Sequence, residues 1–93
     1  MKPLPSELLS QPGAWTQGAM GRNRFNEPVQ PRIACKWCIV GAMYFCEVGY
    51  SDDRKLKLIS KVNKAGFTVI AQWNDARGRT QAEVVAMLKE CGL

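Results

Sequence analysis

The distribution of proline most constrains how this chain folds. The five prolines all lie in the first 31 residues, at Pro3, Pro5, Pro12, Pro28 and Pro31. Because proline lacks a backbone donor and clashes with the preceding helical turn, it interrupts helices and central strands. We therefore expect at most one short helix in this region, at about residues 6–11, and long helices only after residue 31. Residues 1–13 are predicted to form a loosely structured arm.

The length and composition predict one domain that spans residues 1–93. The chain has 93 residues, of which 46% are hydrophobic and 23% charged, as in an ordinary globular protein. The longest apolar run, residues 39–46, is far shorter than the ~20 residues that cross a bilayer. The first residues also lack the apolar core of a secretory signal. These features predict a cytoplasmic protein without a membrane partner.

The central part of the chain is predicted to form a buried helix. Residues 14–20 are expected to form a strand, and residues 21–24 a turn that leads into an irregular segment ending at Pro31. From residue 32 to 48, apolar residues recur at three- and four-residue spacing, and the opposite side is apolar too. A helix that is apolar nearly all round is covered by other elements on most sides. Gly41 would let a neighbouring backbone approach this helix closely.

The C-terminal half contains signals for two more helices and a strand. Ser51 is a plausible N-cap and Gly66 a stop signal for one helix, whereas Thr80 and Glu83 form a capping-box pattern for another that ends at Gly92. Between them, residues 67–73 alternate in a way typical of a strand. The predicted fold is therefore a single small α+β domain. It has three main helices, a central buried helix among them, and a small antiparallel sheet of two or three strands.

The cysteines are predicted to be free thiols in the core. They are Cys35, Cys38, Cys46 and Cys91, and the chain has no histidine. If residues 35–46 form one helix, Cys46 lies about 12 Å along its axis from Cys38, too far for both to bind one zinc ion. A redox pair of Cys35 and Cys38 and a metal site remain the alternatives. We expect no cofactor and no metal.

Cations recur along one predicted helix. The chain carries 13 Lys and Arg against 8 Asp and Glu, a net charge of +5. The stripe consists of Arg54, Lys57, Lys61 and Lys64, at a spacing that repeats on one face, and is predicted to point outward, opposite the apolar residues of the same helix. Such a face suits phosphates or an acidic protein, with a merely solvated face as the alternative. Four loop residues, Arg22, Arg24, Arg77 and Arg79, would extend it if they lie on the same side.

No catalytic set can be assembled from the sequence. Asp75 follows Asn74 beside a large aromatic residue, but no second acid or base lies near it in the sequence. Asn and Asp also form turns by bonding their own backbone. The three tryptophans fit a core better than a stacking platform, because each lies in an apolar periodic context. We therefore expect a protein that is not an enzyme and has no small-molecule substrate.

Three segments resemble a small bacterial and phage family of unknown function (6197-type). They are Trp15-Thr16-Gln17-Gly18-Ala19, then Trp37-Cys38-Ile39-Val40-Gly41-Ala42, then Trp73-Asn74-Asp75 followed by Gly78-Arg79-Thr80, Glu83-Val84 and Leu88. The resemblance covers most of the chain from residue 15 onward. It brings no activity, substrate or catalytic residue, and it implies the cytoplasm of a bacterial host cell.

Together these observations predict a non-enzymatic accessory protein that binds a macromolecular partner. The partner is expected to be a host protein or ribonucleoprotein complex. The phage members of the similar family imply an inhibitor of a host defence or nucleic-acid-handling complex, such as an anti-CRISPR-type role. The alternative is a module that binds nucleic acid directly through the basic helix 54–64.

Overall fold

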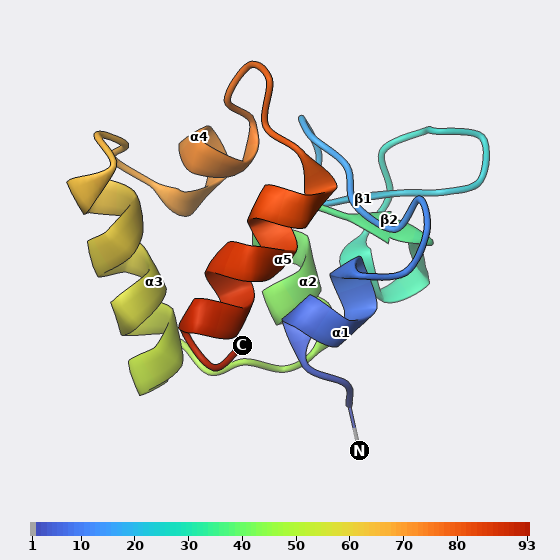
Figure 1. Ribbon diagram of the computed structural model, residues 1–93. Coiled ribbons are helices and arrows are strands. Elements are labelled where there is room, and N and C mark those ends of the chain that lie inside the picture. The colour runs from blue at the N-terminus through green and yellow to red at the C-terminus, as the bar shows by residue number, and fades with distance from the viewer. Residues whose placement is uncertain (1) are drawn as a thin grey trace.

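The computed structural model describes residues 2–93, which form a single α+β domain, as predicted (Figure 1). The elements are α1 (Pro5–Leu9), β1 (Gly21–Arg22), η1 (Pro31–Ile33, a 3-10 helix), β2 (Lys36–Trp37), α2 (Ile39–Phe45), α3 (Asp53–Lys64), α4 (Ile70–Asn74) and α5 (Gln81–Glu90). The two short strands pair antiparallel, with Gly21 opposite Trp37 and Arg22 opposite Lys36. The domain measures 35 × 33 × 20 Å.

The hydrophobic core lies between α5 and the helices around it. In Figure 1, α5 runs through the middle, with α1 on one side, α3 on the other and α2 behind. The largest fully buried apolar side chains come from almost every helix: Leu9, Ile39, Leu58, Val62, Val84, Leu88 and Leu93. None of the helices formed by residues 2–93 is long and apolar enough to cross a membrane.

The N-terminal segment contains the predicted short helix, but it is not a loose arm. Leu8 and Leu9 of α1 are buried in the core. The backbone N–H of Ser6 donates to the carbonyl of Leu93 at 2.8 Å, which ties the two ends of the chain together. Burial of two adjacent leucines against α5 offsets the cost of ordering this segment. Met1 lies outside the described residues.

The prediction of one continuous helix over residues 32–48 is wrong. The segment divides into η1, β2 and α2. The backbone of Trp37 instead pairs with residues far away in sequence: its N–H donates to Ala14 at 2.8 Å and its carbonyl accepts from Thr16 at 3.0 Å. The helix begins only after Cys38, whose Sγ accepts from the N–H of Gly41 at 3.4 Å. Strand pairing therefore outweighs the helical spacing of the apolar residues.

The predicted strand at residues 14–20 and turn at residues 21–24 are also wrong. Residues 14–20 are irregular apart from an isolated bridge between Trp15 and Trp37, and β1 occupies Gly21–Arg22. The turn instead lies at residues 24–25, where Oδ1 of Asn23 accepts from the N–H groups of Phe25 and Glu27. An asparagine side chain that bonds the following backbone in this way favours a turn over a strand.

The predicted strand at residues 67–73 is wrong: residues 67–69 are irregular, and residues 70–73 belong to α4. The side chain of Gln72 accepts from the N–H groups of Thr68 and Val69 at 3.0 and 3.4 Å, and so satisfies donors that precede α4. Ile70 and Trp73, three residues apart, both point into the core. The alternating pattern was thus compatible with a short helix.

The two remaining helices follow their sequence signals closely. The N-cap of α3 is Asp52 rather than the predicted Ser51, and Gly66 follows its end with φ +96°. In α5, the backbone N–H of Thr80 donates to Glu83 at 2.9 Å, and the N–H of Glu83 donates to the Thr80 hydroxyl oxygen at 3.2 Å. This is the predicted capping box.

Candidate functional site

The cationic residues of α3 differ in whether their side chains are already paired with other groups of the chain. The guanidinium of Arg54 donates two bonds to the carboxylate of Asp52, at 3.0 and 2.8 Å, and this pairing lowers the pKa of Asp52 to about 2. Lys61 forms an ion pair with Glu90 of α5 at 3.2 Å. Lys57 and Lys64 are exposed and make no ion pair within residues 2–93. Only the last two are fully available to a partner.

The sequence predicts that the whole stripe lies opposite the buried side of α3, and the structure agrees for Lys57 and Lys64, about 140° and 160° from the buried Val62, but not for Arg54 and Lys61. At about 100° per residue, Arg54 lies roughly 40° from the buried Leu58 around the helix, and Lys61 about 60° from it. Arg54 and Lys61 therefore lie alongside the seam between α3 and α5. This explains why Arg54 and Lys61 reach polar groups at the end of α5 and beyond it, Glu90 and the carbonyl of Gly92.

Arg22 and Arg24 belong to a different part of the molecule. Each of the three guanidinium nitrogens of Arg22 makes one hydrogen bond, to the Thr16 hydroxyl and to the carbonyls of Gln17 and Asn26 at 3.0–3.1 Å. Arg22 therefore fixes the loop around β1. Arg24 is exposed, with its guanidinium 4.9 Å from the ring centre of Phe25.

Arg77 and Arg79 lie in the loop between α4 and α5. The guanidinium of Arg79 stacks 3.8 Å from the ring centre of Trp73 and donates to the carbonyl of that residue at 2.8 Å. It also contacts Glu83 at 3.5 Å, so Arg79 packs the loop against the core. Arg77 is exposed.

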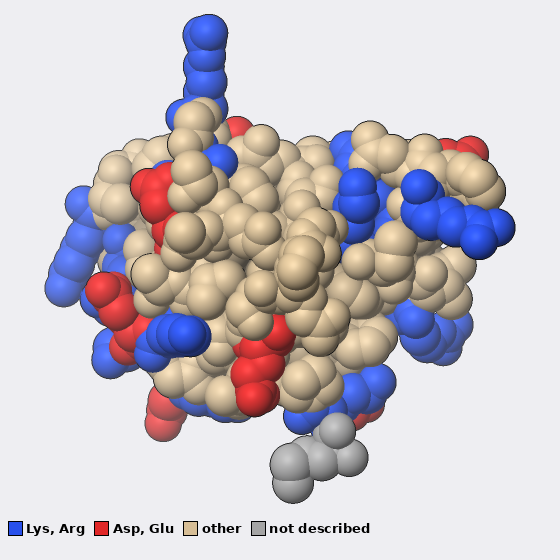
Figure 2. All heavy atoms as spheres, turned by 45° about the vertical axis from the view of Figure 1, so that its right-hand side comes forward, with Lys and Arg blue, Asp and Glu red and all other residues tan. Residues whose placement is uncertain are grey.

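The eight predicted binding residues do not form one surface. In Figure 1, α3 lies at the left edge of the molecule, the segment after β1 at the right edge, and the α4–α5 loop at the top. Figure 2 shows Lys and Arg spread around the edge of one face, with mainly uncharged surface between them. Four of the eight are exposed and make no ion pair with other described residues: Arg24, Lys57, Lys64 and Arg77.

Asn74 joins the three segments that carry the family resemblance. Its side chain is fully buried, and its Oδ1 accepts from the indole N–H of Trp15 at 2.9 Å and from the backbone N–H of Ile39 at 3.0 Å. Its amide nitrogen donates to the carbonyl of Thr16 and to the carboxylate of Asp75. All four bonds that an asparagine side chain can make are thus used. Sequence reasoning treated Asn74 as a loop residue and missed this role.

Asp75 completes this network. Its Oδ1 accepts from the backbone N–H of Gly18 at 3.0 Å as well as from Asn74. The amide of Gln17 donates to the carbonyls of Asn74 and Ala76 in the same region. These contacts give Asp75 a structural task, since it holds the segment around Gly18 onto the end of α4.

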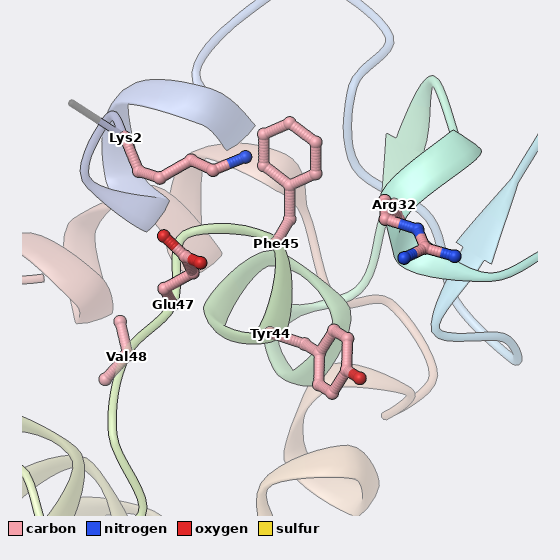
Figure 3. Close-up of a pocket in the computed structure, with 6 residues that line it drawn as sticks. All are labelled: Lys2, Arg32, Tyr44, Phe45, Glu47 and Val48. Atoms are coloured by element: carbon pink, nitrogen blue, oxygen red, sulfur yellow. The ribbon is translucent and has the colours of Figure 1, made fainter.

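A pocket of about 440 Å³ lies between the N-terminus and the end of α2. It is lined by Lys2, Arg32, Tyr44, Phe45, Glu47 and Val48. Figure 3 shows the ammonium of Lys2 directed at the ring of Phe45, 4.4 Å from its centre, while the guanidinium of Arg32 points away on the other side of that ring. Glu47 is the single carboxylate among the lining residues. The pocket therefore lacks the paired acids of a glycosidase-type site.

The cysteines are free thiols in different surroundings. Cys38, Cys46 and Cys91 are buried, as predicted, but Cys35 is exposed because it lies in the short segment between η1 and β2. Burial raises the pKa of Cys38 and of Cys91, and raises that of Cys46 to about 11. These thiols stay protonated at neutral pH, whereas a reactive redox pair needs a lowered pKa. No group of three potential metal ligands occurs within residues 2–93.

A second surface feature is an apolar groove between α2, α3 and α4, which we call the α3 groove. Its volume is about 420 Å³, and Lys55 is its only charged lining residue. Sequence reasoning missed it because its walls come from three separate elements. One signal was present, since Leu56 lies outside the buried stripe of α3 and is 51% exposed.

Comparisons with known proteins identify a family but no function. No curated protein and no solved structure matches this chain. The model of a family of unknown function (DUF6197) matches residues 6–92. That match includes all three segments that meet at Asn74. The chain therefore belongs to the DUF6197 family.

Proposed function

We propose that this chain is a non-enzymatic accessory protein, and that the outer side of α3 docks on an acidic surface of a partner protein. The observation that carries the proposal is the exposure of Lys57 and Lys64, seven residues apart and hence on the same side of a helix at the edge of the molecule (Figure 1). Cations held this way steer association with a surface of opposite charge.

The charges around Lys57 and Lys64 favour a protein partner over nucleic acid. Carboxylates lie among the cations, with Asp53 in the first turn of α3 and Glu90 paired with Lys61. These carboxylates would repel the phosphates of a nucleic acid, whereas a protein surface can carry both acidic and basic groups that complement them. A host protein or ribonucleoprotein complex, inhibited or redirected by this chain, is the partner class that we propose.

The polar residues that most resembled a catalytic site support binding rather than catalysis. The side-chain hydrogen bonds of Asn74, and both bonds that Oδ1 of Asp75 accepts, join parts of this chain to one another. A catalytic carboxylate works with a second acid or base, and no ion pair or hydrogen bond joins Asp75 to one within residues 2–93.

The test compares two double variants with the same change of net charge. In the first, Lys57→Glu and Lys64→Glu reverse the outer side of α3. The matched control, Arg24→Glu and Arg77→Glu, changes two exposed cations in loops elsewhere. Lys61 is left intact because its ion pair with Glu90 also joins α3 to α5.

Partners are recovered from a host lysate treated with nuclease, and their association rates are then measured by biolayer interferometry at several salt concentrations. We expect the α3 variant to associate at least about tenfold more slowly, and the control to keep the original rate. Equal rates for the α3 variant and the original chain would refute docking at α3. Loss of binding after nuclease treatment would favour the alternative, a module that binds nucleic acid directly.

A further inference from the structure

The α3 groove has a buried apolar floor and exposed apolar walls. Met43 of α2 and Ile70 of α4 form part of the floor and are 3% and 7% exposed. Two wall residues, Leu56 of α3 and Val69 before α4, are each 51% exposed. Burying such side chains against an apolar ligand is favourable at about 25 cal/mol per Å².

Tyr50 and Lys55 stand together beside this apolar surface. The side chain of Tyr50 is 91% exposed, and the ammonium of Lys55 lies 4.3 Å from the centre of its ring. This cation–π contact limits where the ammonium can go. The groove therefore presents one positive charge next to apolar walls.

No carboxylate of the described chain neutralises Lys55. Within residues 2–93, Lys55 takes part in no ion pair. Of the two nearby acids, Asp52 is bound by Arg54, and Asp53 lies about 160° away from Lys55 around α3. Among the residues that line the groove, none is a carboxylate that could pair with Lys55.

We propose that the α3 groove binds a small apolar molecule that carries one carboxylate, such as a medium-chain fatty acid. The apolar body would lie on Met43 and Ile70, and the carboxylate would pair with Lys55. The volume of about 420 Å³ lies within the range of roughly 300–1,000 Å³ that is typical of small-ligand sites.

This proposal is independent of the docking proposed for the outer side of α3. Ile59 lines the groove, and Lys57 lies about 160° from it around the helix. A ligand in the groove and a protein on Lys57 and Lys64 would therefore occupy different sides of α3. Failure of one proposal leaves the other standing.

The experiment uses decanoate and decanol, which share a chain length and differ in charge. Binding to the full chain is measured by calorimetry, with decanoate kept below its micelle concentration. We expect decanoate to bind more tightly than decanol. Lys55→Gln should weaken the binding of decanoate by about tenfold, because one charge-assisted contact is lost. It should leave the affinity for decanol unchanged. The matched control, Lys57→Gln, removes a cation from the other side of α3 and should change neither affinity.

A second variant tests the position of the site. Val69→Asp places a negative charge in the wall of the groove at the N-cap of α4, where aspartate is a favoured residue, so the fold should be retained. Binding of decanoate should be lost. The proposal is overturned if decanol binds as tightly as decanoate, or if Lys57→Gln reduces the affinity for decanoate as much as Lys55→Gln does. It is also overturned if the folded Val69→Asp variant still binds decanoate.

Discussion

At the scale of single residues, Asn74 shows how much a buried amide can organise. Its side chain accepts hydrogen bonds from the indole N–H of Trp15 and from the backbone N–H of Ile39 at the start of α2. It donates one to the carbonyl of Thr16. These groups lie 35 to 59 residues away from it in sequence. A buried polar group with all its partners is well tolerated, but each partner that loses its bond costs free energy.

We predict that Asn74→Ala is strongly destabilising. The indole N–H of Trp15, the N–H of Ile39 and the carbonyl of Thr16 would lose their partner, and two or three such groups cost about 3 to 5 kcal/mol in the free energy of unfolding. Urea denaturation followed by tryptophan fluorescence measures the change. Gln30→Ala is the control, because that exposed side chain makes no hydrogen bond with residues 2–93, and it should change stability little. Equal midpoints for the two variants would contradict the structural role of Asn74.

Asp52 gives a pH-dependent prediction at the same scale. The guanidinium of Arg54 pairs with its side chain, which also caps α3 by accepting from the N–H of Arg54, so the pKa of Asp52 falls from 3.8 to about 2. Because the folded-state pKa lies below the unfolded one, the charged form stabilises the fold above about pH 4, and this contribution is lost as the pH falls toward 2.

Asp52→Asn keeps a good N-cap and removes the charge. We therefore expect the variant to melt at a lower temperature than the original chain at pH 6, and the difference to shrink steadily between pH 4 and pH 2. Thermal denaturation followed by circular dichroism across this range measures it. A constant difference would mean that the charge of Asp52 contributes nothing.

At the scale of elements, α2 depends on a very close backbone contact. A methyl group added at Gly41 would overlap the carbonyl of Met20, a main-chain group that cannot move aside as a flexible side chain can. The expectation that Gly41 permits close approach of a neighbour is confirmed. The same approach lets the N–H of Cys38 donate to Met20 at 3.4 Å, just before α2 begins.

We predict that Gly41→Ala destabilises the fold despite the higher helix propensity of alanine. The gain of up to about 1 kcal/mol from propensity is smaller than the overlap penalty of roughly 1–3 kcal/mol or more. Gly49→Ala is the matched control, since a methyl group there meets no atom within 4 Å and its φ is not positive. Urea unfolding midpoints should fall for Gly41→Ala alone. A midpoint raised by Gly41→Ala would show that α2 is not held against Met20.

At the scale of the whole molecule, the two ends of the chain close the fold. The end of the chain follows α5 and lies beside α1 (Figure 1), where Leu93 is fully buried and its carbonyl accepts from the backbone N–H of Ser6. The amide of Gln81 donates to the carbonyls of Leu9 and Gln11, which fixes the other end of α1. Leu8, Leu9 and Ala14 are therefore part of the core, whereas residues 10–13 are exposed.

Removal of residues 1–10 should accordingly destabilise the domain. Losing the buried side chains of Leu8 and Leu9 alone costs about 3 to 6 kcal/mol, a large share of the roughly 5–14 kcal/mol available to a domain of this size. Removal of residues 1–3 is the control and should have a small effect, because the described residues among them, Lys2 and Pro3, are exposed. Thermal denaturation distinguishes the two. If both truncated chains melt like the original, α1 is dispensable.

The sequence alone determined those elements whose signals are local. The Thr80–Glu83 capping box, the stop at Gly66 and the limit that proline sets on N-terminal helices involve groups within a few residues of one another. The spacing of the α3 cations was local too, so their shared helix was predictable. Their separation from Arg22 and Arg24 was not, because the distance between loops depends on how the elements pack.

Only the tertiary structure decided the regions around Trp37 and Trp73 and the α3 groove. Trp37 leaves the helical pattern because Ala14 and Thr16 offer its backbone hydrogen bonds, and Asn74 is buried because Trp15 and Ile39 need its oxygen. The groove exists only once α2, α3 and α4 are in place. In each case the partners are distant in sequence, and the satisfaction of buried hydrogen-bonding groups outweighs the preference of the local pattern.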